Sequence, residues 1–354
     1  MQHYVMTILL FIIIFGAVVI SHEFGHFLIA RVNGIHVVEF MIGMGPKLLS
    51  WGKGDTVYSL RLLPIGGACV FEGEDGLNNA EGDAADSKGA FPNANVWARI
   101  STVVAGPFFN IVLAMLMALI MVPMIEIRDT EATQVPEDGA AWEAGLRDGD
   151  RIVSLNGEKV YLFSEIYIFA QMNKGEAVRI VYARGDEKYE TVMTPKYDEA
   201  TDAYYFGIVN GNAMQIKGLD TLKYGYYEVR ASVKNTYKSL IMLVTGKVSR
   251  TQVAGPVGMA NMVGEIYEET KEDWRDVFVN VLNLIMLISV NLGIMNILPL
   301  PALDGGRLVF LIVEVFRGKP VPPEKEGMVH FAGMIFFLIL MVLVFFNDIV
   351  NIVH

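Results

Sequence analysis

The sequence predicts a polytopic α-helical membrane protein with four transmembrane helices. Hydrophobic residues make up 53% of its 354 residues and charged residues only 19%, whereas soluble domains carry about 25% charged residues. Four segments have no charged residue except Glu23, and each is long enough to cross a bilayer, which takes about 20 residues. These segments are Tyr4–Ala30, Ile100–Ile125, Val277–Leu303 and Gly327–Phe346.

The first of these segments is expected to remain in the protein as a helix. A cleaved signal peptide would carry basic residues before its apolar run and small residues at a cleavage site. No Lys or Arg precedes Arg31, and the apolar run leads directly into His22-Glu23.

Charge and cysteine content narrow the function classes. The chain has 39 acidic and 28 basic residues, a net charge of −11, which disfavours nucleic acid as a partner. Its single cysteine, Cys69, cannot form an internal disulfide.

Basic residues in the short connecting segments predict the orientation of the helices. Six Lys or Arg residues lie in the connection between the first two helices and four in the connection between the last two, while the segments before the first helix and after the last have none. Because such residues collect on the cytoplasmic side, both termini and the large segment 126–276 are expected to be extracytoplasmic.

Segment 126–276 changes character along its length. Residues 126–211 carry 17 acidic and 9 basic residues, and within them Val178–Tyr182 and Tyr189–Met193 are typical of strands. Residues 217–250 are basic and amphipathic, which fits a helix on the membrane surface and equally a solvated linker helix. On the cytoplasmic side, the acidic stretch Glu72–Asp86 is predicted to be a flexible loop.

The string His22-Glu23-Phe24-Gly25-His26 carries the chemistry. Two histidines four residues apart share a helix face and can hold one zinc ion, and the glutamate between them can act as a general base on a zinc-bound water. Ionisable side chains within a membrane helix are costly and mark function by default. The alternative is a pair of histidines that cap a buried helix.

A catalytic zinc takes three protein ligands and keeps one position open. Asp304 is the best candidate for the third, because it lies at the same predicted depth as His22 and His26. It follows Pro299 and Pro301, which break the helix where unwound backbone must line a cavity or be buried. An ordinary turn at the membrane exit is the alternative.

Three other residues compete with Asp304 as the third ligand. His36 and Glu39 follow an Asn-Gly turn signal and are expected in a loop, and His330 begins the fourth predicted helix.

Taken together, these motifs resemble the site-2 protease family of intramembrane zinc metalloproteases, in particular its bacterial RseP-type branch. The specific feature is the pairing of His-Glu-x-x-His with the Asn-x-x-Pro-x-Pro-x-Leu-Asp-Gly string that ends at Gly305. Further similar stretches are Gly43–Gly67, which looks like the family's membrane-associated β-hairpin region, Trp97–Asn110 and Gly255–Gly258.

The resemblance implies roles for individual residues. His22, His26 and Asp304 would hold Zn²⁺, and Glu23 would activate the water. Asn291 and Asn296 match family asparagines that assist the substrate or the oxyanion.

The resemblance also implies the substrates: transmembrane segments of single-pass membrane proteins, such as trimmed anti-sigma factors, or signal-peptide remnants. We expect the strand-like Thr56–Leu63 to receive the unwound substrate by edge addition. Proline at Tyr58 or Leu60 should then slow cleavage.

Residues Glu143–Gly157 resemble the core of a PDZ domain, with a helix-to-strand turn at Gly149-Asp150 and a hairpin turn at Asn156-Gly157. PDZ domains bind extended peptides by strand addition. A spacer that keeps bulky substrates away from the site is the equally favoured alternative.

The expected organisation has four parts within a multi-pass protein of the bacterial cytoplasmic membrane. The first half of the protease core, with the β-hairpin region, covers residues 1–125, and a PDZ-like α+β domain covers 126–211. An amphipathic linker at the outer membrane face follows over 212–276, and the second half of the core covers 277–354. The active site is expected toward the cytoplasmic side.

Two rival functions stay open at this point. One is a non-catalytic membrane scaffold that presents a PDZ domain, although such a protein has no use for Glu23 beside a metal. The other is a membrane-anchored zinc protease that cuts soluble substrates.

Overall fold

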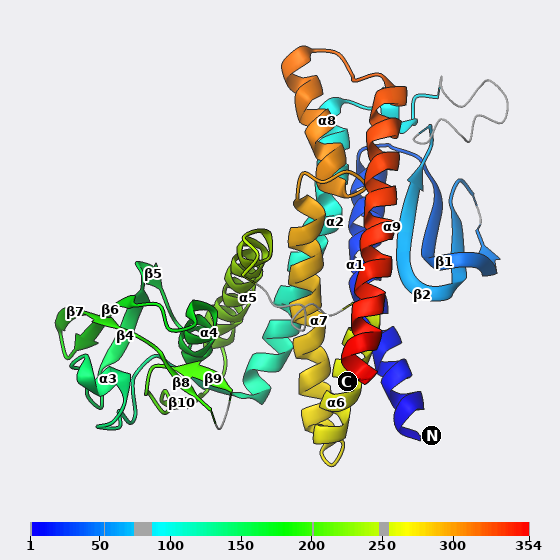
Figure 1. Cartoon of the computed structure of the whole chain (residues 1–354). Coiled ribbons are helices and arrows are strands. Elements are labelled where there is room, and N and C mark those ends of the chain that lie inside the picture. The colour runs from blue at the N-terminus through cyan, green and yellow to red at the C-terminus, as the bar shows by residue number, and fades with distance from the viewer. Residues whose placement is uncertain (1, 53, 74–86, 200–201, 248–254, 354) are drawn as a thin grey trace. The chain divides into compact units, whose positions relative to one another are not determined.

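The computed structural model describes residues 2–52, 54–73, 87–199, 202–247 and 255–353. The chain forms two compact units, which are described separately below (Figure 1). The first consists of Met1–Met117 and Thr236–His354, and the second of Ala118–Asn235. Most of the expected acidic loop, residues 74–86, lies outside the described residues.

Four helices are long and apolar enough to cross a membrane, which confirms the four predicted spans among the described residues. They are α1 (Gln2–Val32), α2 (Val96–Met121), α7 (Trp274–Ile297) and α9 (Pro323–Val353). Within the apolar windows of α7 and α9, 44% and 6% of the residues are buried. Helix α9 therefore leaves most of its apolar surface for lipid.

The apolar core of the first unit forms where α1 packs against α7 and α6 (Pro256–Thr270). Its buried members are Leu10, Ile14, Val18, Val263, Val277, Leu284 and Ile285. Tight packing of these side chains holds α1, which carries the His-Glu-x-x-His string, against α7.

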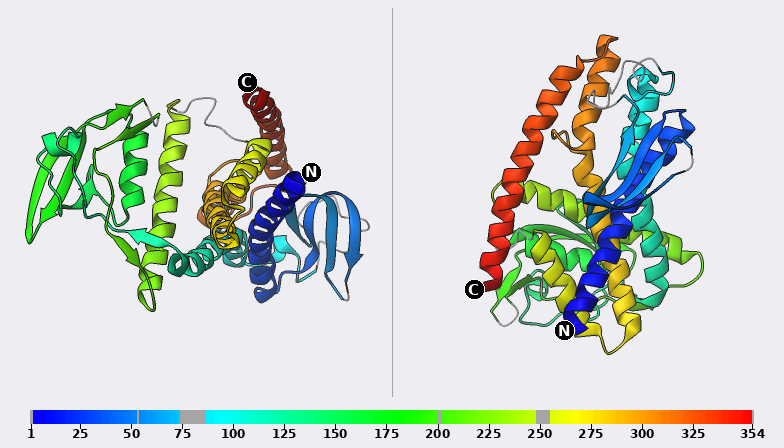
Figure 2. Two further views of the ribbon diagram at one scale, coloured as in Figure 1. Left: turned by 90° about the horizontal axis from the view of Figure 1, so that it is seen from below. Right: turned by 90° about the vertical axis from the view of Figure 1, so that its right-hand side faces the viewer.

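Strands β1 (Val37–Trp51) and β2 (Val57–Phe71) form an antiparallel hairpin that contacts α1 (Figure 2). The two strands bend, so that residues 57–60 pair with 39–42 on one side and residues 58–60 also pair with 49–51 on the other. Residues 67–71 pair with 37–42 and form an edge of the sheet.

The prediction that Thr56–Leu63 receives a substrate strand is therefore wrong for 58–60, because both sides of that stretch are already paired. The prediction that Glu39 lies in a loop is also wrong, since it lies within β1. Gly43 and Gly45 adopt φ of +86° and +88° and interrupt the regular alternation of side chains along β1. The sequence of this strand therefore does not show the alternating pattern by which a strand is predicted.

The second unit contains a four-stranded antiparallel sheet with the order β5-β4-β6-β7. Its strands are β4 (Arg151–Leu155), β5 (Glu158–Lys159), β6 (Val178–Arg184) and β7 (Glu187–Met193). Asn156 and Gly157 have φ of +48° and +82°, as a two-residue hairpin turn requires. The predicted strands and hairpin turn are thus confirmed.

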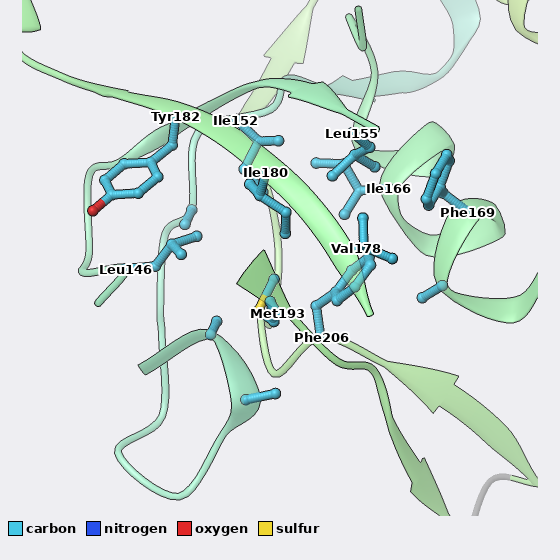
Figure 3. Packing of buried hydrophobic residues seen from close by; sticks show 14 of the residues in the cluster. Leu146, Ile152, Leu155, Ile166, Phe169, Val178, Ile180, Tyr182, Met193 and Phe206 are labelled. Atoms are coloured by element: carbon cyan, nitrogen blue, oxygen red, sulfur yellow. The ribbon is translucent and has the colours of Figure 1, made fainter. Parts of the chain in front are cut away.

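Short helices and two small strand pairs complete this unit. The strands β3 (Glu126–Arg128) and β10 (Ala213–Gln215) pair with each other, as do β8 (Lys196–Asp198) and β9 (Ala203–Tyr205). The helices are α3 (Ala140–Glu143), α4 (Phe163–Asn173) and the start of α5 (Asp220–Val244). Figure 3 shows the sheet residues Ile152, Leu155, Val178 and Ile180 packing with Ile166 and Phe169 of α4.

Candidate metal centre

Helix α1 brings His22, Glu23 and His26 to one buried site. Their exposed fractions are 7%, 9% and 7%. Because the two histidines lie four residues apart, their side chains project from the same face of the helix. Their Nε2 atoms are 3.2 Å apart.

Asp304 reaches these histidines from the break after α7. Helix α7 ends at Ile297, residues 298–303 are not helical, and α8 (Asp304–Arg317) begins at Asp304 itself. Oδ2 of Asp304 lies 3.1 Å from Nε2 of His22 and 3.3 Å from Nε2 of His26. The break predicted from the two prolines therefore delivers a carboxylate to the pair of histidines.

These three atoms fit a zinc ion. In tetrahedral coordination, with Zn–N and Zn–O distances of about 2.0–2.1 Å, neighbouring ligand atoms lie about 3.3 Å apart. The observed separations of 3.1 to 3.3 Å match this spacing. Among the described residues, the trio of His22, His26 and Asp304 is the one group of His, Cys, Asp and Glu able to hold a metal.

Two glycines allow the helices to approach closely at the cluster. A Cβ on Gly106 of α2 would lie 2.2 Å from Nε2 of His26, and a Cβ on Gly25 of α1 would lie 2.4 Å from the carbonyl oxygen of Ala105. Such distances are impossible for real side chains, so only glycine fits here.

A cavity of about 420 Å³ opens beside the cluster. Glu23 and Asn296 lie in its wall together with the three candidate ligands. The edge strand of the hairpin forms another part of the wall, through Gly67 and Cys69 among others. The cavity is thus large enough to hold water beside the cluster.

The two predicted asparagines lie in different surroundings. Nδ2 of Asn296 is 3.2 Å from Nε2 of His22. Asn291 is exposed, hydrogen-bonds with Thr236, and does not belong to the described lining of the cavity. The structure therefore brings Asn296, and not Asn291, to the cluster.

The three competing ligands lie elsewhere. Nδ1 of His36 lies 2.8 Å from a Glu72 carboxylate oxygen, and Glu39 accepts a hydrogen bond from Ser59. Nδ1 of His330 accepts a hydrogen bond from the backbone N–H of Ala302. None of the three belongs to the metal-binding group found among the described residues.

Sequence reasoning did not single out Arg307, which also lines the cavity. It follows Asp304 by three residues in α8, so both side chains lie on one helix face. The spacing of Asp304 and Arg307 is visible in the sequence, but the short cytoplasmic connection expected there gives no reason to predict helix α8.

Comparison with known proteins agrees with this geometry. The model of peptidase family M50 matches residues 10–340. The chain is 32% identical to the regulator of sigma-W protease RasP of Bacillus subtilis, over 98% of this chain and 99% of that protein. It is also 32% identical to the zinc metalloprotease RasP of Bacillus licheniformis, over 97% and 98% of the two chains.

Among solved structures, the PDZ domain of the SdrC-like protein from Listeria monocytogenes is similar to a part of the chain. It covers 24% of this chain and 90% of that domain, at 20% identity and a TM-score of 0.22. The match to the family model and to its relatives extends over nearly the whole chain. The protein therefore belongs to peptidase family M50 and is an intramembrane zinc metalloprotease of the site-2 protease type.

Proposed function

We propose that His22, His26 and Asp304 hold Zn²⁺, that Glu23 is the general base, and that the enzyme cuts transmembrane segments of single-pass membrane proteins. The observation that carries this proposal is the 3.1 to 3.3 Å spacing of the three ligand atoms in the wall of the cavity, with two of them on a helix that can cross a membrane.

The chain's own residues supply the proton transfers. Zn²⁺, when bound, polarises the scissile carbonyl and lowers the pKa of water to about 7. Glu23 takes a proton from the attacking water and passes it to the leaving amine. The backbone N–H of Cys69 interacts with the Glu23 carboxylate and helps to hold it. The amide of Asn296 donates to the developing oxyanion.

The zinc content of purified protein tests the ligand set. Wild type in detergent should hold about one zinc per chain, and Asp304→Ala and His22→Ala should lose it. His36→Ala is the matched control, because His36 lies outside the cluster. This variant should keep its zinc. Full zinc occupancy in Asp304→Ala would refute the proposed third ligand.

The substrate is proposed to bind as a strand along residues 67–71, the hairpin edge that lies at the cavity. A peptide bond inside a helix is protected by the helix's own hydrogen bonds, and edge addition replaces these without demanding a particular sequence.

The native Cys69 permits a direct test of strand addition, since it is the only cysteine of the chain. In a Glu23→Gln background, substrates with one cysteine at successive positions should form disulfides with Cys69 at every second position. A period near 3.6, or no cross-link at all, would contradict strand addition.

The substrate class is proposed from the family and from the relative whose name is regulator of sigma-W protease. It comprises membrane-bound anti-sigma factors trimmed on their outer side and signal-peptide remnants. Mapping the cleavage site separates this proposal from its rival: cuts in soluble loops would favour an enzyme for soluble substrates.

We place the termini and segment 126–276 outside the cytoplasm and the metal centre toward the cytoplasmic side of the membrane. The basic residues in the two short connections support this orientation. In a Cys69→Ser background, Asp186→Cys should react with an impermeant maleimide on intact spheroplasts, and Lys88→Cys should not. The reverse pattern would invert the topology.

We propose that residues 126–211 act as a PDZ-like domain, with 212–276 as its amphipathic linker to the membrane core. The Asn156-Gly157 hairpin and the four-stranded sheet support this reading. If the domain excludes bulky substrates, cleavage by the full chain should fall steeply as the substrate's outer domain is enlarged. Cleavage independent of that size would favour peptide capture.

A further inference from the structure

The proposed zinc centre, on which this inference rests, imposes a requirement on each histidine ring. The Nε2 atoms of His22 and His26 face each other and Asp304, so Nε2 is the atom that ligates. A neutral imidazole that ligates through Nε2 carries its proton on Nδ1. Each Nδ1–H then needs a hydrogen-bond acceptor, which also holds the ring in position.

His26 has such an acceptor on helix α2. Its Nδ1 lies 2.8 Å from the backbone carbonyl oxygen of Thr102, which can only accept. Thr102 is itself fully buried. The orientation of His26 is therefore set by the backbone and is independent of the side chain at position 102.

His22 faces a side chain instead. Its Nδ1 lies 3.4 Å from the amide group of Asn110, two turns further along α2 from Thr102. Asn110 is fully buried, and its Oδ1 accepts no hydrogen bond from any residue that the structure describes. A buried carbonyl oxygen without a donor is unfavourable, because it has given up its hydrogen bonds to water.

Asn110 is also fixed in place. Its backbone carbonyl oxygen accepts a hydrogen bond of 2.8 Å from the hydroxyl of Ser289, a fully buried residue of α7. Gly293, one turn further along α7, packs beside it, and a Cβ there would lie 3.4 Å from the Asn110 Cβ. The hydrogen bond from Ser289 thus holds the backbone of Asn110, while its amide group can rotate about the Cβ–Cγ bond.

We propose that Asn110 is the positioning residue for His22. With the amide rotated by half a turn, its Oδ1 accepts the Nδ1–H of His22, so that Nε2 keeps its lone pair for the metal. The same rotation supplies the buried Oδ1 with the donor that it lacks. In the opposite amide orientation the NH₂ group would require an unprotonated Nδ1, and the ring proton would then block Nε2.

Zinc affinity of the full-length protein in detergent, measured by competition with a chelator, tests this proposal. Asn110→Leu has nearly the same volume and no acceptor, and its affinity should be about 10- to 100-fold weaker, as for other residues that orient a metal ligand. Asn110→Asp retains an acceptor and should stay within about tenfold of wild type. If Asn110→Leu does not fold, Asn110→Ala takes its place, because it also lacks the acceptor.

Leu113→Ala is the matched control, because it alters the packing of α2 one turn beyond Asn110 and leaves the amide and its contacts intact. Its zinc affinity should be that of wild type. Wild-type affinity in Asn110→Leu or Asn110→Ala would overturn the proposal, as would an Asn110→Asp variant as weak as Asn110→Leu. A wild-type protein without zinc would instead overturn the metal centre itself.

Discussion

The backbone N–H of Ala302 donates a hydrogen bond to Nδ1 of His330, 3.0 Å away. Ala302 has φ of +70°, a left-handed conformation that is unfavourable for alanine. This bond therefore ties the non-helical segment before Asp304 to helix α9. A histidine considered as a metal ligand turns out to support the segment that carries one.

Replacing His330 should loosen Asp304. We expect His330→Leu to weaken zinc binding about tenfold, the lower end of the range for residues that orient a ligand. His330→Asn, which can still accept the hydrogen bond, should bind zinc nearly as well as wild type. Chelator competition measures the zinc affinity of both variants. Equal affinity of His330→Leu and wild type would show that the segment before Asp304 keeps its conformation without the hydrogen bond to His330.

Glu23→Gln should separate metal binding from catalysis. Loss of a general base lowers kcat by about 10²- to 10⁴-fold, while the three ligand atoms stay in place. Zinc content and cleavage of a membrane substrate in proteoliposomes measure the two effects. Substantial cleavage by zinc-loaded Glu23→Gln would assign the general base to another residue. As a control, removal of the metal by a chelator should abolish cleavage by the wild type.

Gly106→Ala should disrupt the centre. Its Cβ would lie 2.2 Å from Nε2 of His26, so α2 must move away from α1 or the ring must turn. We expect loss of bound zinc and a lower unfolding temperature. Gly16→Ala is the matched control on α1, because a Cβ there meets no described atom within 4 Å. Normal zinc content in Gly106→Ala would contradict the close packing.

Asp348 should stabilise the first unit by capping α6. Its buried carboxylate accepts hydrogen bonds from the backbone N–H groups of Gly255, Val257 and Gly258, at 2.8 to 3.1 Å. Asp348→Ala should lower the free energy of unfolding by about 3 kcal/mol, and Asp348→Asn by less. Denaturant titration in detergent measures the free energy of unfolding. The control is Glu272→Ala, which removes an exposed acid and should stay within about 0.5 kcal/mol of wild type.

The second unit should become less stable as the pH rises through neutrality. Burial and the negative charge of Glu165 raise the pKa of Glu228 to about 7. Because this lies above the ordinary value of 4.5, the stabilising contribution of protonated Glu228 is complete below pH 4.5 and is lost as the pH rises through about 7.

Hydrogen exchange of the α5 backbone in the full chain measures this effect. After correction for the intrinsic rate, protection should be greater at pH 5.5 than at pH 8, and Glu228→Gln should remove the difference. Glu126→Gln, on an exposed side chain of the same unit, should retain it. A pH dependence unchanged in Glu228→Gln would assign it to another group.

Much of the membrane core could be predicted from the sequence. The apolar runs give the four long helices, because length and lack of charge suffice for a span. The spacing of His22 and His26 places them on one face, and the prolines after α7 mark the break that delivers Asp304.

Contacts between distant helices could not be predicted. Nothing in the local pattern of α2 shows that Gly106 meets the histidine rings, or that Asn110 meets His22, because both depend on how α2 packs against α1. The bending of the hairpin could likewise not be predicted from the sequence. It converts residues 58–60, which have the composition of a strand, into an inner strand and leaves 67–71 at the edge.

The three candidate ligands come from opposite ends of the polypeptide, two from α1 and one from the start of α8. During synthesis on the ribosome, the nascent chain carries His22 and His26 long before Asp304 is made. With the proposed ligand set, the metal centre is therefore incomplete until Asp304 has been added to the chain. A chain that ends before α8 lacks the proposed third ligand. Under the proposed ligand set, the order of the gene thus delays proteolysis until the chain is nearly finished.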